Sequence, residues 1–148
     1  MDTNLHIPFM RRCLELARLA RQNGESAIGS LVVRDGAVIG EGIEASRRAL
    51  DITCHAEIEA IRAARQTLQA RHLPGCTLYT THEPCLMCSY VIRQARISLV
   101  VIGCAVPDTG GFSSPYPLLT VTDIAPWGEP PGVVMGVLEA DCRAVSVP

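Results

Sequence analysis

The chain has 148 residues, a length typical of one domain, and 48% of them are hydrophobic, which is enough for one well-buried core. Its formal net charge is −2, so no overall field attracts it to nucleic acid or to a membrane. No stretch approaches the roughly 20 apolar residues that cross a bilayer, and the seven cysteines, an odd number spread along the chain, argue against a disulfide framework. We therefore expect a cytoplasmic protein.

Hydrophobic periodicity predicts a first helix, which Gly24 is placed to end. The apolar residues at helical spacing are Met10, Cys13, Leu14, Ala17 and Ala20. Four arginines fall largely off this stripe: Arg11, Arg12, Arg18 and Arg21. We interpret them as a solvated helix face rather than a phosphate-binding surface.

The next segments alternate between strands and helices. Two apolar runs, 28–33 and 37–42, surround Asp35-Gly36, which predicts a β-hairpin with a type I′ turn. Helices are expected at 55–70 and 85–95, and strands at 76–81 and 97–103, of which the second is apolar enough to be covered on both sides. The last strand and helix are expected at 133–137 and 138–144.

Between these segments, residues 104–132 lose all regular pattern and contain six prolines, which favours an active-site or interface loop. No boundary divides the chain, so residues 1–148 are expected to form a single domain. The alternation of elements predicts a mixed sheet with helices on both faces.

Two short segments carry the chemistry. His55-Ala56-Glu57 opens one predicted helix, and Pro84-Cys85-Leu86-Met87-Cys88 opens another. Together they match H-x-E…P-C-x-x-C, the signature of zinc deaminases. Cys85 and Cys88 project from one face of a first helical turn, where free N–H groups and the helix dipole favour thiolates.

Two thiolates and one neutral imidazole give zinc three protein ligands and leave one position for water, as in catalytic sites. Glu57 points away from His55 on the helix, so it can stand beside the metal and shuttle protons without binding it. A fourth ligand from Cys54 or Cys76 would instead close the site and make it structural.

From the hairpin to the last helix, the sequence resembles the cytidine-deaminase-like superfamily, in particular the branch of guanine deaminases, cytosine deaminases and tRNA adenosine deaminases. The segments that carry the resemblance are 28–30 (IGS), 38–42 (VIGEG), 55–58 (HAEI), 78–88 (LYTTHEPCLMC), 96–97 (RI), 136–138 (GVL) and Cys142. The resemblance implies a three-layer α/β/α fold with a five-stranded mixed sheet and a homodimer. It also implies one zinc ion per chain, with His55, Cys85 and Cys88 as ligands and Glu57 as the catalytic proton shuttle.

Substrate contacts are expected from Ile28, Gly29, Glu44 and Phe112. Many relatives carry Asn where this chain has Glu44, and there the side chain meets the base. An ionised Glu accepts hydrogen bonds but cannot donate them, so a ligand at Glu44 should present N–H donors, as guanine does. The alternative is that Glu44 points to solvent.

We predict hydrolytic deamination of a free nucleobase or related aminoheterocycle, guanine- or cytosine-like, with release of ammonia. The rivals are adenosine-to-inosine deamination in tRNA and deamination of a nucleoside or nucleotide. RNA binding requires basic residues and stacking aromatics, yet residues 97–148 contain five acidic residues and one arginine, Arg143. A small-molecule partner is therefore expected, and nucleic acid and membrane are not.

Overall fold

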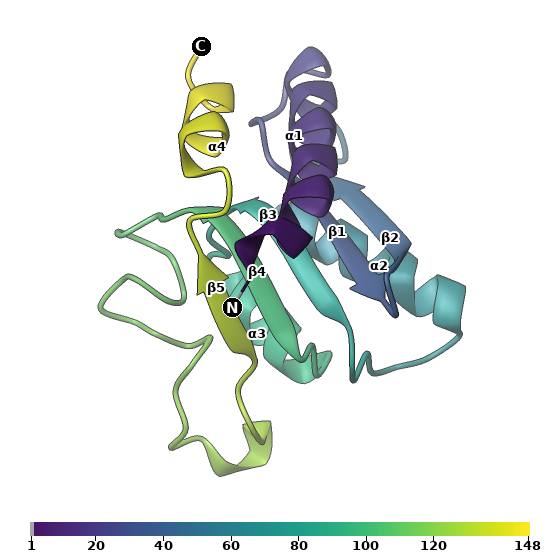
Figure 1. Ribbon diagram of the computed structural model, residues 1–148, viewed down its shortest axis with the longest axis vertical. Coiled ribbons are helices and arrows are strands. Elements are labelled where there is room, and N and C mark those ends of the chain that lie inside the picture. The colour runs from purple at the N-terminus through teal and green to yellow at the C-terminus, as the bar shows by residue number, and fades with distance from the viewer. Residues whose placement is uncertain (1) are drawn as a thin grey trace.

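A five-stranded mixed sheet forms the centre of the computed structural model, which describes residues 2–148 (Figure 1). Its strands, in spatial order, are β2 (Ala37–Ile43), β1 (Gly29–Arg34), β3 (Thr77–His82), β4 (Leu99–Cys104) and β5 (Gly132–Met135). Strand β1 is antiparallel to both of its neighbours, whereas β3, β4 and β5 are parallel. Asp35 and Gly36 both have positive φ, at 50° and 77°, which confirms the type I′ turn between β1 and β2.

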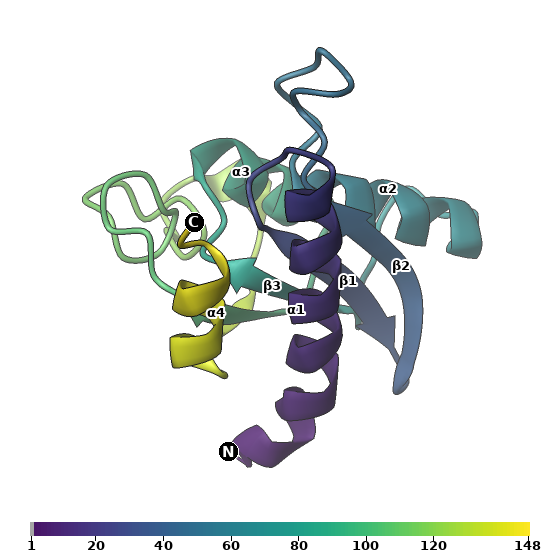
Figure 2. The same ribbon diagram turned by 90° about the horizontal axis from the view of Figure 1, so that it is seen from above.

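Helices cover both faces of the sheet, as Figure 2 shows. Their bounds are α1 (Ile7–Gln22) and α4 (Glu139–Val145) on one face, and α2 (Ala56–Leu68) and α3 (Leu86–Gln94) on the other. Short 3₁₀ turns lie at Thr3–His6 and Ala125–Trp127. This arrangement confirms the predicted three-layer α/β/α fold. Among residues 2–148, no helix combines the length and apolar character that a membrane crossing requires.

The sheet divides the core in two because successive side chains of a strand point to opposite faces. Leu31 packs in the cluster under α1 and α4, whereas Val32 packs in the cluster under α2 and α3. Gly29 lies where α1 crosses β1, and a Cβ there would collide with the carbonyl oxygen of Cys13. The structure thus gives Gly29 a packing role, and its contact with substrate stays a prediction.

Strand direction gathers several segments at one edge of the sheet. Since β1 is antiparallel to β2 and β3, and β3 to β5 are parallel, the carboxyl ends of β2, β3, β4 and β5 share that edge with the beginning of β1. The end of α1, the 44–55 segment, the start of α3 and the start of the long loop after β4 therefore meet there. In open α/β sheets, this is the edge that usually carries the site.

Candidate metal centre and active site

Three side chains converge at this edge from the first turns of α2 and α3. His55 is the N-cap residue of α2, Cys85 is the N-cap residue of α3, and Cys88 lies three residues further on. The Nδ1 atom of His55 lies 3.6 Å from Cys85 Sγ and 3.5 Å from Cys88 Sγ. All three ligand atoms lie within 4.8 Å of one another. The fold thus turns Nδ1 of His55, rather than Nε2, toward the two sulfur atoms. The sequence could not indicate which nitrogen is the ligand atom.

These distances fit a zinc ion. Tetrahedral bonds of about 2.3 Å to sulfur and about 2.1 Å to nitrogen place the two ligand atoms about 3.6 Å apart, as observed for His55 and Cys85. Among residues 2–148 neither cysteine considered as a fourth ligand joins the group, because Cys54 Sγ meets Arg62 and Cys76 lies in the core below α2 and α3. The His/Cys/Cys set therefore fits one zinc ion per chain, with one position left for water.

The electrostatic surroundings favour the thiolate at Cys85, whereas the hydrogen bond to Cys85 and burial raise the pKa of Cys88. The pKa of Cys85 is lowered to about 5, first by a hydrogen bond from the Cys88 thiol and then by the backbone N–H of Cys88, the charge of His55 and the backbone N–H of Met87. These N–H groups belong to the first turn of α3, whose dipole points its positive end at the sulfur. The helix start that the sequence indicated thus prepares a metal ligand.

Glu57 lies beside the three ligands without joining them. Its carboxylate is buried, with Oε2 3.6 Å from Cys88 Sγ. The Thr80 hydroxyl lies 3.3 Å from Oε1 and shares its one hydrogen between Oε1 and the carbonyl oxygen of His82, which is 3.0 Å away. Burial raises the pKa of Glu57 to about 7, and the nearby Cys85 acts in the same direction. A carboxyl group at such a position can accept a proton and return it, which is the requirement for a general acid–base.

The four predicted substrate contacts differ in their surroundings. Glu44 is buried and accepts a 2.6 Å hydrogen bond from Ser46 Oγ, so it does not point to solvent. Its backbone N–H donates to the carbonyl of Ile28, which is half-buried. Phe112, on the long loop, is 38% exposed. The structure thus brings Ile28, Gly29 and Glu44 together, while their contact with a substrate stays a prediction.

Glu83 is a residue whose function sequence reasoning missed, although it lies inside the conspicuous segment before Cys85. Its buried carboxylate accepts hydrogen bonds from the backbone N–H groups of Val106 (2.7 Å), Phe112 (2.8 Å) and Ser113 (2.5 Å), and from Ser113 Oγ (2.6 Å). Burial alone would raise the pKa of Glu83, but these bonds outweigh it and lower the pKa. One carboxylate thereby fixes the first part of the 105–131 loop beside Cys85.

Arg93 holds the second part of the same loop. This buried guanidinium donates to the carbonyl groups of Leu118 (3.0 Å), Val121 (2.9 Å) and Gly128 (3.1 Å), and lies 5.4 Å from the centre of the Trp127 ring. Apart from the 3₁₀ turn at Ala125–Trp127, the loop lacks regular structure, as predicted, yet two buried charges order it. Both charges come from the segment that carries the cysteine ligands.

Replacing Glu83 with Gln should lower the free energy of unfolding by about 3 kcal/mol, because the new amide NH₂ group faces two donors that then lack an acceptor. Urea denaturation would measure this change. Ser113→Ala is the control, since it removes a single hydroxyl donor and should cost about 1 kcal/mol. An unfolding midpoint of Glu83→Gln equal to that of the original chain would contradict the role of Glu83 in the loop.

Matches to known proteins cover most of the chain. The family described as the cytidine and deoxycytidylate deaminase zinc-binding region matches residues 3–104. A tRNA-specific adenosine deaminase of Aquifex aeolicus is 35% identical over 111 residues, which cover 75% of this chain and 74% of that protein. A tRNA(Ile)-lysidine synthase of Deinococcus deserti is 38% identical over 137 residues, 92% of this chain, but the chain spans only 25% of that protein.

A solved structure from studies of A-to-I editing by tRNA:A34 deaminases at the wobble position of transfer RNA matches with a TM-score of 0.87. It is 35% identical in sequence, and the match covers 93% of this chain and 97% of that one. Both the fold and the sequence of this relative therefore correspond to almost all of the chain.

These relatives contradict two predictions made from the sequence. A free guanine- or cytosine-like base as the substrate is wrong, because similarity across the chain leads to tRNA deaminases. The exclusion of nucleic acid as a partner is wrong for the same reason. The physical error lay in counting charge along the sequence: a net charge of −2 and an acidic last third do not reveal where the 13 arginines lie in the folded chain.

Proposed function

The chain belongs to the family of the cytidine and deoxycytidylate deaminase zinc-binding region, and we propose from this premise that it converts adenosine to inosine in tRNA by hydrolysis. The membership confirms the resemblance and the zinc-dependent deaminase chemistry that the sequence indicated. The substrate, and its position 34 in the anticodon, come from the relatives described above. We also propose that the protein is located in the cytoplasm, as expected from the sequence.

The observation that carries this proposal is the extent of the similarity. A tRNA:A34 deaminase structure corresponds to 93% of the chain, a share that requires most of the 105–131 loop, which lies outside the matched zinc-binding region of residues 3–104. Loops around a site determine which substrate a shared fold accepts. Similarity that includes them therefore supports the substrate class as well as the chemistry.

In the proposed reaction, His55, Cys85 and Cys88 hold the zinc ion. When bound, zinc lowers the pKa of water to about 7 and thus supplies hydroxide at neutral pH. Glu57 accepts a proton from the attacking water, passes one to the ring nitrogen N1 and delivers one to the departing amino group. Thr80 orients this carboxylate through its hydrogen bond to Oε1.

The atoms of this hydrolysis balance. A bond forms between water oxygen and C6 of adenine, and the C6–N6 bond breaks. Of the two water hydrogens, one remains on N1 of inosine and the other leaves in ammonia. Glu57 ends in its starting protonation state, so it can act again in the next catalytic cycle.

Inosine formation tests the proposal. Zinc-loaded protein is incubated with an anticodon stem-loop RNA that has adenosine at position 34, and the products are digested and measured by mass spectrometry. We expect inosine and an equal amount of ammonia, and no product from the same RNA with guanosine at that position. Turnover of a free base, without inosine in the RNA, would refute the proposal.

A further inference from the structure

We propose that Arg18, Arg21 and Arg47 form a phosphate-binding surface, here called the arginine edge, that holds the backbone of the RNA at the edge of the sheet that also carries the metal centre. This inference rests on the proposed function and extends it from the reacting base to the RNA backbone. It also reverses the interpretation of Arg18 and Arg21 as a solvated helix face with no binding role.

The topology places these arginines at the site edge. Arg18 and Arg21 lie in the last turns of α1, which ends just before β1. The first residue of β1, Gly29, donates its N–H to Thr81 Oγ1 at 3.3 Å, and the preceding residue, Thr80, holds Glu57. The end of α1 is therefore connected to the catalytic edge through two strands.

A buried carboxylate joins the third arginine to the end of α1. Glu25 follows α1 and accepts the backbone N–H groups of Arg47 at 3.2 Å and Arg48 at 2.7 Å. The Arg47 guanidinium itself donates to the carbonyl of Gly24 at 3.1 Å. The segment that begins with Arg47 continues to Cys54 and His55, the first zinc ligand. Arg48 is left out of the arginine edge because its side chain lines a hollow with Glu41 and Glu59.

In the part of the chain that the structure describes, none of the three guanidinium groups forms an ion pair. Within residues 2–148, the ion pairs involve Arg12, Arg34, Arg62 and Arg143, and none involves a residue of the arginine edge. All three side chains are exposed. When surface arginines neutralise phosphates, the nucleic acid releases its condensed counterions, and this release is a major source of affinity.

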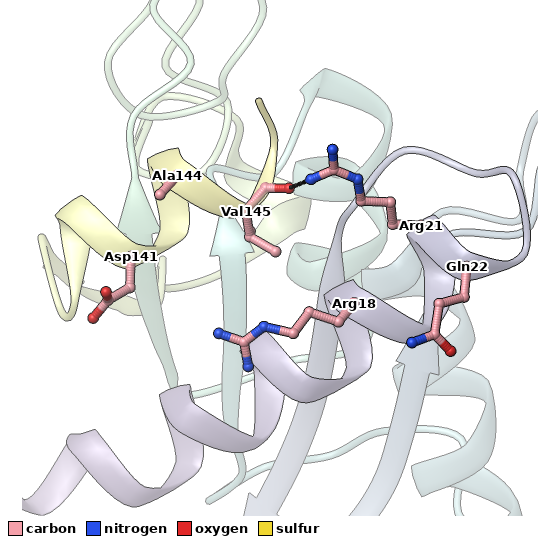
Figure 3. Close-up of a pocket in the computed structure, with 6 residues that line it drawn as sticks. All are labelled: Arg18, Arg21, Gln22, Asp141, Ala144 and Val145. Atoms are coloured by element: carbon pink, nitrogen blue, oxygen red, sulfur yellow. Dashed lines mark hydrogen bonds between the residues drawn. The ribbon is translucent and has the colours of Figure 1, made fainter. Parts of the chain in front are cut away.

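Figure 3 shows two residues of the arginine edge, Arg18 and Arg21, on α1. Arg18 and Arg21 extend from α1 toward α4, where Arg21 donates a 3.1 Å hydrogen bond to the carbonyl of Val145. The hollow between the helices has a volume of about 570 Å³, which can admit a phosphate group. Asp141 also lines this hollow, and its one negative charge offsets only one of the two arginine charges, which leaves a net charge of +1.

The binding of the anticodon stem-loop RNA over a range of salt concentrations tests the arginine edge. For Arg18→Gln/Arg21→Gln/Arg47→Gln, we expect at least about a tenfold loss of affinity at about 0.1 M salt. The slope of log K against log salt should fall by about 2 to 3, close to one for each lost phosphate contact. Turnover at saturating RNA should stay within about twofold, since none of the three arginines touches the metal ligands or Glu57.

The matched control, Arg11→Gln/Arg71→Gln/Arg96→Gln, removes the same charge from exposed positions elsewhere. Arg11 precedes Arg21 by ten residues, about 15 Å along α1, and the other two precede β3 and β4 at the opposite edge. We expect this variant to keep the slope of the original chain. Equal loss in both triple variants would overturn the arginine edge, because it would show an effect of net charge alone.

Two further readouts separate this inference from others. If the original chain makes inosine while the arginine-edge variant binds RNA as well as the control does, the arginine edge is refuted and the proposed function stands. Absence of inosine with the original chain refutes the function itself. If the arginine-edge variant sediments with a different mass from the original chain, the surface mediates contact between copies of the chain, and RNA binding there is refuted. Should the triple variant fail to fold, Arg18→Gln alone must still lower the salt slope by nearly one.

Discussion

Glu57→Gln is expected to lower the rate of inosine formation at least about 100-fold, the scale of lost acid–base catalysis, while the protein keeps its zinc. Gln has nearly the shape of Glu and can still accept the hydrogen bond that Thr80 donates to Oε1. It cannot take a proton from water or return one to the base. The defect should therefore appear in kcat, measured with saturating RNA, and not in metal content.

The control for this variant is Glu59→Gln. Glu59 lies on the same turn of α2 but is paired with Arg62 away from the ligands. Its loss should leave the rate within about twofold, because an exposed ion pair contributes little to stability and touches no reacting atom. Retained activity in fully zinc-loaded Glu57→Gln would remove Glu57 from the mechanism.

Cys88→Ala is expected to abolish zinc binding and activity together. The variant leaves two protein ligands, and the ligand set of a catalytic zinc site needs three. Because metal binding is coupled to folding, the melting temperature of the variant should also stop responding to added zinc. Metal analysis would measure the change, with a fall from about one zinc ion per chain to nearly none.

Cys54→Ala provides the matched control, since Cys54 is also a buried thiol and directly precedes His55. It lies outside the ligand group, so the variant should keep one zinc ion and full activity. X-ray absorption can check the ligand set directly. One tightly bound zinc ion in Cys88→Ala, or a site closed by a fourth protein ligand, would reject the assignment of His55, Cys85 and Cys88.

Elements with strong local signals were predicted well. Asp35-Gly36 specifies the hairpin turn by itself, because both residues readily adopt positive φ. Helices α2 and α3 begin within one residue of the positions that the motif indicated, with His55 and Cys85 as their N-cap residues. The loop after β4 was recognised from its prolines, but its ordering by Glu83 and Arg93 was not. Their hydrogen bonds reach carbonyl and N–H groups more than 20 residues away, which leave no periodic trace.

The sequence by itself determined the chemistry: ligand types, their spacing and the neighbouring Glu57 are local properties of two helix starts, and they indicate a zinc deaminase. The tertiary structure decided which residues share an edge of the sheet with that chemistry. Arg18 and Arg47 are far apart along the chain, and only the strand directions and the Glu25 contact bring them to one edge. Counting charge along the sequence therefore excluded RNA wrongly, because binding depends on where charges lie in space.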